Sequence, residues 1–185
     1  MPGFIATIDT SVLVSLQSAG LLGAVSVLFD RLLVPVKVRE ELRDGGERNS
    51  NALKALEEFA FFEHCDDYDR VSVEILLQTR EHLREGRDEG EAEAVVQAAQ
   101  KRAEMVLTDD PLGRTWAQKH TLDCHGTIWI CYQLRQRGFL TELRPHYVCM
   151  LRSGRRQPMQ AINQYLREFG EALISQDEYL SYTKK

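Results

Sequence analysis

Acidic side chains follow two apolar segments of the chain, and their types and positions could support chemistry. Asp9 follows residues 4–8, and Asp109 and Asp110 close the segment that begins at residues 105–108. Short apolar runs that end in polar residues and lead into a helical pattern are typical of buried strands. Because parallel strands place their carboxyl ends at one edge of a sheet, where α/β proteins bind ligands, we expect these acids to lie close together.

A helix after the next apolar segment is expected to bring another acid to the same edge. Glu40 and Glu41 follow residues 31–36, which read as a second strand. Glu41 stands next to the apolar Leu42, so we expect Glu41 to face inward and Glu40 to lie outside. The inward carboxylate would then approach the acids that follow the strands.

A second acid-bearing helix is expected over residues 88–99, which are rich in alanine. Acids near its start are favoured by the positive end of the helix dipole. Glu91 lies near the apolar face, whereas Glu93 diverges from Glu91 by ~200° around the helix. We therefore expect Glu91 to point toward the sheet edge and Glu93 to face solvent. Asp109 and Asp110 cannot be separated in this way, and both stay open as ligands.

The gathered carboxylates predict a metal site. Four of them cannot all stay ionised at short range without a shared proton or a cation, and hard oxygen ligands select Mg²⁺ or Mn²⁺. One or two such ions orient a phosphodiester, lower the pKa of a bound water and stabilise the leaving oxygen. The chemistry predicted is metal-dependent phosphodiester hydrolysis, and the candidate metal ligands are Asp9, Glu91, Asp110 and Asp109.

Each acid taken singly has a simpler interpretation as a helix cap or a solvated side chain. For Asp9 the cap and the ligand are equally good explanations until the other acids are considered. Thr10 or Ser11 can cap the following helix instead, which would leave the carboxylate of Asp9 for another role.

Apolar segments typical of strands alternate with helical patterns along the chain, including a helix expected over residues 72–83. The alternation predicts an α/β fold with a parallel sheet covered by helices on both faces. A length of 185 residues fits one domain with a sizeable core. We assign the acid-bearing domain to residues 1–150 and a helical extension packed on it to residues 151–185, with the last residues, about ten, frayed.

Composition and charge restrict the partners. Twenty-three basic and 28 acidic side chains give a formal charge of −5, so no global basic field attracts nucleic acid, although bound divalent cations reverse the sign locally. The four cysteines show no metal-binding spacing and fit reduced thiols of a cytoplasmic protein. No apolar stretch of this sequence is long enough to span a bilayer. We expect no membrane partner and a cytoplasmic location.

Several short motifs occur in a characteristic order: residues 8–16 (IDTSVLVSL), 20–22 (GLL), 34–42 (VPVKVREEL), 90–94 (GEAEA), 107–114 (LTDDPLGR) and 126–127 (GT). Together they resemble PIN-domain nucleases, in particular a prokaryotic subfamily related to the VapC-type toxins. Residues 151–154 and 166–171 resemble the tail of that subfamily. Each motif alone is weakly specific, whereas their order and spacing are considerably more so.

The resemblance implies a three-layer α/β/α sandwich with a central, mainly parallel sheet, a site for one or two Mg²⁺ or Mn²⁺ ions, and endoribonuclease activity on single-stranded RNA. Ser11 and Thr108 match positions that hydrogen-bond the carboxylates or a metal-bound water. Thr127, at a helix start, could cap that helix or hold a phosphate oxygen. Matched by position, the implied catalytic acids are Asp9, Glu41, Glu91 and Asp110.

The resemblance also implies partners. Many relatives are toxins that a small antitoxin protein holds inactive, and dimers are common among them. Arg114 follows the second acidic strand end and is our candidate for positioning an RNA substrate. The alternative is a PIN fold that binds nucleic acid or protein without significant nuclease activity, which the charge of −5 favours slightly. A receiver-type fold is disfavoured because no expected strand ends in the lysine that it needs.

Two tryptophans and five histidines complete the chemically distinctive side chains. Trp116 and Trp129 lie on apolar helical faces, so we expect them in the core rather than as platforms for base stacking. The histidines share no metal-ligand spacing and are expected to be surface or structural residues. His125 is the one whose position could face the acidic edge.

Overall fold

A parallel sheet of five strands organises the protein. The computed structural model describes residues 4–79 and 88–183. The strands are ordered β3-β2-β1-β4-β5, and every neighbouring pair is parallel. Their bounds are β1 (Phe4–Ile8), β2 (Phe29–Pro35), β3 (Phe62–Cys65), β4 (Met105–Leu107) and β5 (Asp123–His125). All of these carboxyl ends therefore lie at one edge of the sheet, as the sequence predicts.

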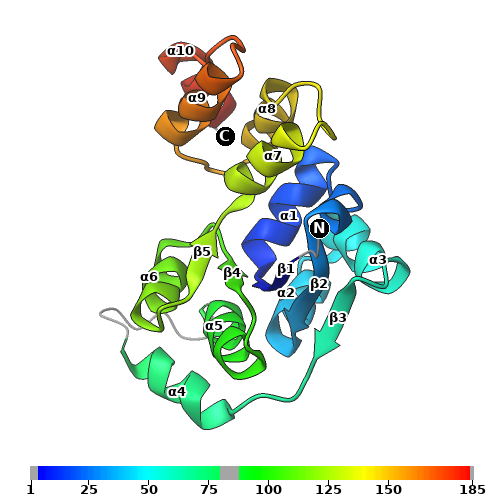
Figure 1. The fold of residues 1–185 in the computed structure, drawn as a ribbon, viewed down its shortest axis with the longest axis vertical. Coiled ribbons are helices and arrows are strands. Elements are labelled where there is room, and N and C mark those ends of the chain that lie inside the picture. The colour runs from blue at the N-terminus through cyan, green and yellow to red at the C-terminus, as the bar shows by residue number, and fades with distance from the viewer. Residues whose placement is uncertain (1–3, 80–87, 184–185) are drawn as a thin grey trace.

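Helices connect the strands and continue beyond the last one (Figure 1). They are α1 (Thr10–Ala19), α2 (Val36–Asp44), α3 (Ser50–Glu58), α4 (Arg70–Gln78), α5 (Glu89–Lys101), α6 (Pro111–Lys119), α7 (Thr127–Gln136), α8 (Arg144–Arg152), α9 (Met159–Glu168) and α10 (Gln176–Thr183). Two 3₁₀ helices, η1 (Ala24–Val27) and η2 (Gly46–Asn49), lie in the connections. The second part of the helix expected over residues 72–83, from residue 80, lies outside the described residues.

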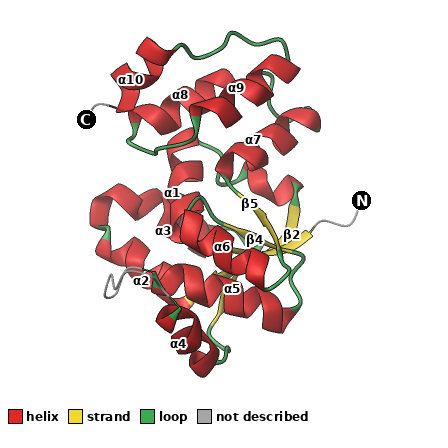
Figure 2. Ribbon diagram, turned by 90° about the vertical axis from the view of Figure 1, so that its left-hand side faces the viewer, coloured by secondary structure: helices red, strands yellow, loops and turns green. Residues whose placement is uncertain are grey.

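The helices cover both faces of the sheet and complete a three-layer α/β/α sandwich (Figure 2). Successive side chains of β4 pack into opposite layers. Met105 and Leu107 join the core formed with α1, α3, α7 and α8, whereas Val106 joins the core formed with α4, α5 and α6. Apolar burial on both faces is the main favourable term for such a sheet. The predicted fold class is confirmed.

The last helices, α8, α9 and α10, gather at one end of the molecule beyond α7 (Figures 1 and 2). The hydroxyl of Tyr179 in α10 donates to the backbone carbonyl of Gln157 at 2.9 Å, and Tyr182 packs against the core. The expectation of a frayed end is therefore wrong for residues up to 183, because these aromatic rings anchor α10. The division into residues 1–150 and 151–185 stays a prediction, and α8 spans its boundary.

A buried glutamate joins α5 to the start of α2, and this contact fixes the helix that carries Glu41. Glu93 is only 7% exposed. Its Oε2 accepts a hydrogen bond from the backbone N–H of Lys37 at 2.8 Å, and its Oε1 accepts one from the hydroxyl of Tyr68. The first N–H groups of a helix lack partners within the helix, and a carboxylate can supply one. The expectation that Glu93 faces solvent is wrong because α2 packs beside α5 and covers it.

We predict that Glu93→Ala lowers the free energy of unfolding by about 1–3 kcal/mol, since the N–H of Lys37 and the hydroxyl of Tyr68 would both lose a buried partner. Urea denaturation measures this loss. Glu57→Ala, at an exposed position of α3, is the control and should change stability by less than about 0.5 kcal/mol. Equal effects of the two variants would contradict the assigned role.

Candidate active site

The two acid-tipped strands lie next to each other at the centre of the sheet. β1 pairs with β4 so that Ile8 is level with Leu107, and the N–H of Asp9 donates to the carbonyl of Leu107 at 3.1 Å. The chain builds the sheet outward in one direction from β1 to β3 and in the other from β4 to β5. The crevice between β1 and β4 is therefore a topological switch point, the usual ligand site of open α/β sheets.

Asp9 is buried in this crevice, 1% exposed, and its carboxylate is held by three hydrogen bonds. Oδ1 accepts from the N–H of Val12 at 2.9 Å and from the hydroxyl of Ser11 at 2.7 Å, while Oδ2 accepts from the hydroxyl of Thr108. Asp9 is thus itself the N-cap of α1. The expectation that Thr10 or Ser11 would cap this helix is wrong: Ser11 supports the Asp9 carboxylate instead.

Burial raises the pKa of Asp9 to about 7, against the opposing effect of its three hydrogen bonds. Desolvation disfavours the charged form of a carboxyl group, and the nearby charge of Asp109 adds to the rise. The side chain is therefore held ready to accept either a proton or a cation.

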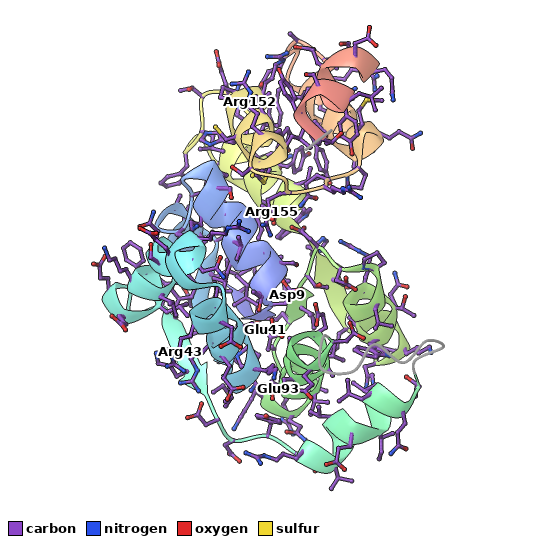
Figure 3. All side chains as sticks on the ribbon, turned by 180° about the vertical axis from the view of Figure 1, so that it is seen from behind. Asp9, Glu41, Arg43, Glu93, Arg152 and Arg155 are labelled. Atoms are coloured by element: carbon purple, nitrogen blue, oxygen red, sulfur yellow. The ribbon has the colours of Figure 1, made fainter. Side chains whose placement is uncertain are left out.

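Glu41 and Glu91 approach the same crevice from two helices. Glu41 in α2 accepts a hydrogen bond from the hydroxyl of Thr10, whereas Glu40 is exposed and pairs with Lys37 at 3.7 Å. The inward orientation expected for Glu41 is therefore observed. Figure 3 shows Asp9 at the start of α1, Glu41 on α2 and Glu93 on α5, one after another down the molecule.

Glu91 lies in the first turn of α5 and has the least compensated carboxylate of the group. Its Oε2 is buried and has no hydrogen-bond partner in the described structure. Burial raises the pKa of Glu91 to about 8, and repulsion by Asp9, Glu41 and Asp110 adds to the rise. Asp9, Glu41 and Asp110 are therefore the acids that surround Glu91.

Two glycines allow the helices to approach this closely. A Cβ at Gly90 would lie 3.0 Å from Oε1 of Glu41, and a Cβ at Gly113 would lie 3.1 Å from the hydroxyl of Thr108 and 3.2 Å from Cγ of Glu91. Real Cβ atoms rarely have contacts this short. The sequence motifs contain both glycines, but their spacing role is visible only once α5 and α6 are placed.

Asp110 and Asp109 have different environments. Asp110 caps α6, because its Oδ1 accepts from the N–H of Leu112 at 2.7 Å. Asp109 accepts four hydrogen bonds: Oδ1 from the N–H of Thr127 at 2.7 Å, and Oδ2 from the hydroxyls of Thr127 at 2.7 Å and Ser15 at 3.1 Å and from the amide of Gln157 at 2.6 Å. Asp109 therefore ties β4 to α1, α7 and the connection before α9.

Sequence reasoning missed Gln157 as a member of the Asp109 network, and it did not foresee how closely Gly126 approaches Asp109. Gln157 is 4% exposed and lies 48 residues beyond Asp109, so no local pattern identifies it. Gly126 precedes Thr127, and a Cβ there would lie 2.5 Å from Oδ1 of Asp109. The GT pair of the sequence motif could have indicated Gly126, since a glycine before a helix start permits close approach.

Arg114 lies at the outer side of this network. Its Nη2 donates to the carbonyl of Thr108 at 3.0 Å, and its Nη1 lies 3.5 Å from the carbonyl of Cys124. The guanidinium is thus held across the ends of β4 and β5, beside the acids.

A family model described as a PIN domain matches residues 5–171. The chain belongs to the PIN-domain family. No curated protein matches the sequence. A solved structure of the PIN domain endonuclease Utp24 is similar, with 16% sequence identity, coverage of 64% of this chain and 80% of that chain, and a TM-score of 0.44. The resemblance to PIN domains is confirmed, and the closer relation to VapC-type toxins stays a prediction.

Asp9, Glu41, Glu91 and Asp110 form what we call the acidic centre of this PIN domain. The oxygen donors of this centre suit a hard cation. In the conformation that the described residues adopt, no three acidic, histidine or cysteine side chains lie close enough to hold one ion. The buried, unpartnered Oε2 of Glu91 and the raised pKa of Asp9 nevertheless mark oxygens whose charge lacks compensation. Such oxygens fit Mg²⁺ or Mn²⁺. Across residues 4–79 and 88–183, no helix combines the length and apolarity needed to cross a membrane.

We predict that the metal-free PIN domain loses stability as the pH rises from about 4 to 8. A carboxyl group whose pKa is higher in the folded than in the unfolded chain binds more protons when folded, so deprotonation between the two pKa values favours unfolding. Each such group contributes a slope of up to about 1.4 kcal/mol per pH unit.

Urea denaturation with EDTA at several pH values measures this slope. Asp9→Asn should flatten it, because asparagine keeps the cap of α1 and removes the ionisation. Asp44→Asn, at an exposed position, should leave it unchanged. A slope that Asp9→Asn does not alter would refute the prediction.

Proposed function

We propose that this PIN domain is a metal-dependent endoribonuclease that hydrolyses phosphodiester bonds of single-stranded RNA. Membership of the family supports a nuclease-type activity. The observation that carries the proposal is the Oε2 of Glu91, which is buried without a partner among carboxylates that oppose its ionisation. Burying such a group is costly unless a cation or a proton balances it.

The residues that would hold one or two Mg²⁺ or Mn²⁺ ions are Asp9, Glu41, Glu91 and Asp110. When bound, a divalent ion supplies a water of lowered pKa and stabilises charge on the leaving oxygen. Ser11 and Thr108 fix the orientation of the Asp9 carboxylate, and Thr10 fixes that of Glu41. Their contribution is to hold oxygens in place before the substrate arrives.

Asp109 has a different role in this proposal from the one that the sequence predicted. It was a candidate ligand, but its oxygens already accept four hydrogen bonds from Ser15, Thr127 and Gln157. We propose that Asp109 positions the end of β4, so that Asp110 beside it can face the ion. Thr127 contributes to the site indirectly, because its N–H and its hydroxyl hold the carboxylate of Asp109 in place.

Arg114 is the side chain that we propose for positioning the RNA backbone. Its guanidinium is held by the carbonyl of Thr108 beside the acids, and a fixed guanidinium binds phosphate oxygens well. Its positive charge also partly offsets the negative charge of the neighbouring acids.

The finer biological assignment follows the resemblance noted in the sequence. We propose a toxin of a toxin–antitoxin pair that acts in the cytoplasm as a homodimer, with a small antitoxin protein that covers the acids. The competing function is a PIN fold that binds nucleic acid or protein without cleaving. Among the described residues, no three acidic, histidine or cysteine side chains lie close enough to hold one ion, and this observation favours the competing function.

Cleavage assays decide between the two functions. We predict that the purified protein cleaves end-labelled single-stranded RNA with Mn²⁺ and not with EDTA. Asp9→Asn and Glu91→Gln should each lower the rate by about 100-fold or more, because each removes an oxygen anion that holds the ion. Glu57→Gln, at an exposed position of α3, is the matched control. Undiminished cleavage by Asp9→Asn, or none by the wild type, would overturn the nuclease proposal.

A comparison of Asp109→Asn and Asp110→Asn tests the separate roles of these acids. Asp110→Asn should weaken Mn²⁺ binding in calorimetry and leave the metal-free Tm nearly unchanged, since asparagine still caps α6. Asp109→Asn should lower metal-free stability by about 1–3 kcal/mol, because its amide would face the donors of Thr127 and Gln157. The opposite pattern would make Asp109 the ligand.

A further inference from the structure

A cavity of about 450 Å³ opens beside the acidic centre. Asp109 and Gly126 line it, and its walls come from α6, α7 and α9. Asp109 thus belongs both to the network that holds the end of β4 and to the cavity wall. The volume falls in the range of sites that bind small organic groups.

Two stacked aromatic rings form part of the wall. The ring of His125, the last residue of β5, and the ring of Trp129 in the first turn of α7 have centroids 3.9 Å apart and planes 12° apart. Both side chains are partly exposed. Burial lowers the pKa of His125, so its ring is held toward the neutral form.

Both tryptophans were expected in the core. Trp116 lies there entirely, whereas Trp129 does so only in part. Trp116 is 1% exposed, and its indole N–H donates to the hydroxyl of Thr79 at 3.1 Å. Trp129 packs against the core and also lines the cavity. A large aromatic side chain in a cavity wall beside a charged site is a feature of ligand pockets.

Charged and polar groups of α6 also line the cavity. Arg114, whose guanidinium is held by the carbonyl of Thr108, is one of them, and Gln118 adds an exposed amide. Flat apolar rings with a nearby guanidinium are the combination that binds unstacked bases of single strands. A paired base, whose faces are covered by its neighbours, could not enter.

We propose that this cavity binds one base of a single-stranded RNA against the wall formed by His125 and Trp129, while the adjoining phosphate lies at the acids. The inference rests on the proposed ribonuclease function for the identity of the strand. It gives that function a physical basis for preferring single strands, since the base must leave its stack to enter.

Oligonucleotides with a single abasic site test the proposal on the wild-type protein. A series of short RNA strands, each lacking one base at a different position, is bound with Ca²⁺ in place of Mn²⁺, so that a divalent ion balances the acids, and is followed by fluorescence anisotropy. One or two positions should bind roughly 5- to 100-fold more weakly than the intact strand, the loss typical of one base stacked on an aromatic side chain. Equal affinity across the series, or no binding of the intact strand, overturns the proposal.

Variants of Trp129 provide the second arm. Trp129→Ala should weaken binding of the intact strand by a similar factor and remove the effect of the sensitive abasic position, whereas Trp129→Phe should restore most of both. Phe139→Ala is the matched control, because Phe139 is 58% exposed and does not line the cavity. A Trp129→Ala protein that keeps the wild-type abasic profile overturns the proposal. Circular dichroism establishes that each variant is folded.

These outcomes are separate from those of the cleavage assay. Base-dependent binding without any Mn²⁺-dependent cleavage would support base binding in the cavity and contradict the proposed nuclease activity. Cleavage could instead occur and be unaffected by both the abasic sites and Trp129→Ala. That result would support the nuclease activity and contradict base binding in the cavity.

Discussion

The structure depends on a buried carboxylate at the point where the sheet changes its direction of growth. Asp9 directly follows the central strand β1, caps α1 and accepts a hydrogen bond from Thr108, which directly follows β4. Each contact stabilises the charged form, yet burial disfavours it more strongly. The fold thereby keeps a group at its centre whose charge is incompletely balanced. A basic partner would have removed that imbalance, and none of the hydrogen bonds to Asp9 comes from one. The imbalance is what makes Asp9, although it caps α1, a candidate for a functional role as well.

The parts of the site that follow from strand ends could be predicted from the sequence. Asp9 and the acids after β4 meet because adjacent parallel strands must end at one edge, and that geometry needs only the recognition of two apolar segments. The inward orientation of Glu41 followed from the apolar neighbour on one side of it. In both cases a short local pattern of apolar and polar residues was enough to predict where the carboxylate lies.

Other parts depend on which helices become neighbours, and no local pattern contains that information. Glu93 was expected in solvent because its own helix gave it a polar side, but α2 packs over that side. Gln157 joins the site from a distant connection, and α10 is ordered by aromatic contacts with segments far from it in the chain. The cap of α1 was misassigned for another reason: Asp9, Thr10 and Ser11 are all residue types that cap helices, and the sequence alone does not show at which of them the helix begins.

Long-range assembly of the acidic centre has a consequence for the protein during its synthesis. The hydrogen bond between Thr108 and Asp9 joins residues 99 positions apart, and Gln157 reaches Asp109 from further along. Chains emerge from the ribosome with the N-terminal end first, and contacts between distant residues form only after both have emerged. A growing chain that has exposed Asp9 and Glu41 therefore still lacks the strand and the helix that complete the cluster. The acidic centre stays incomplete until β4 and α5 have also emerged.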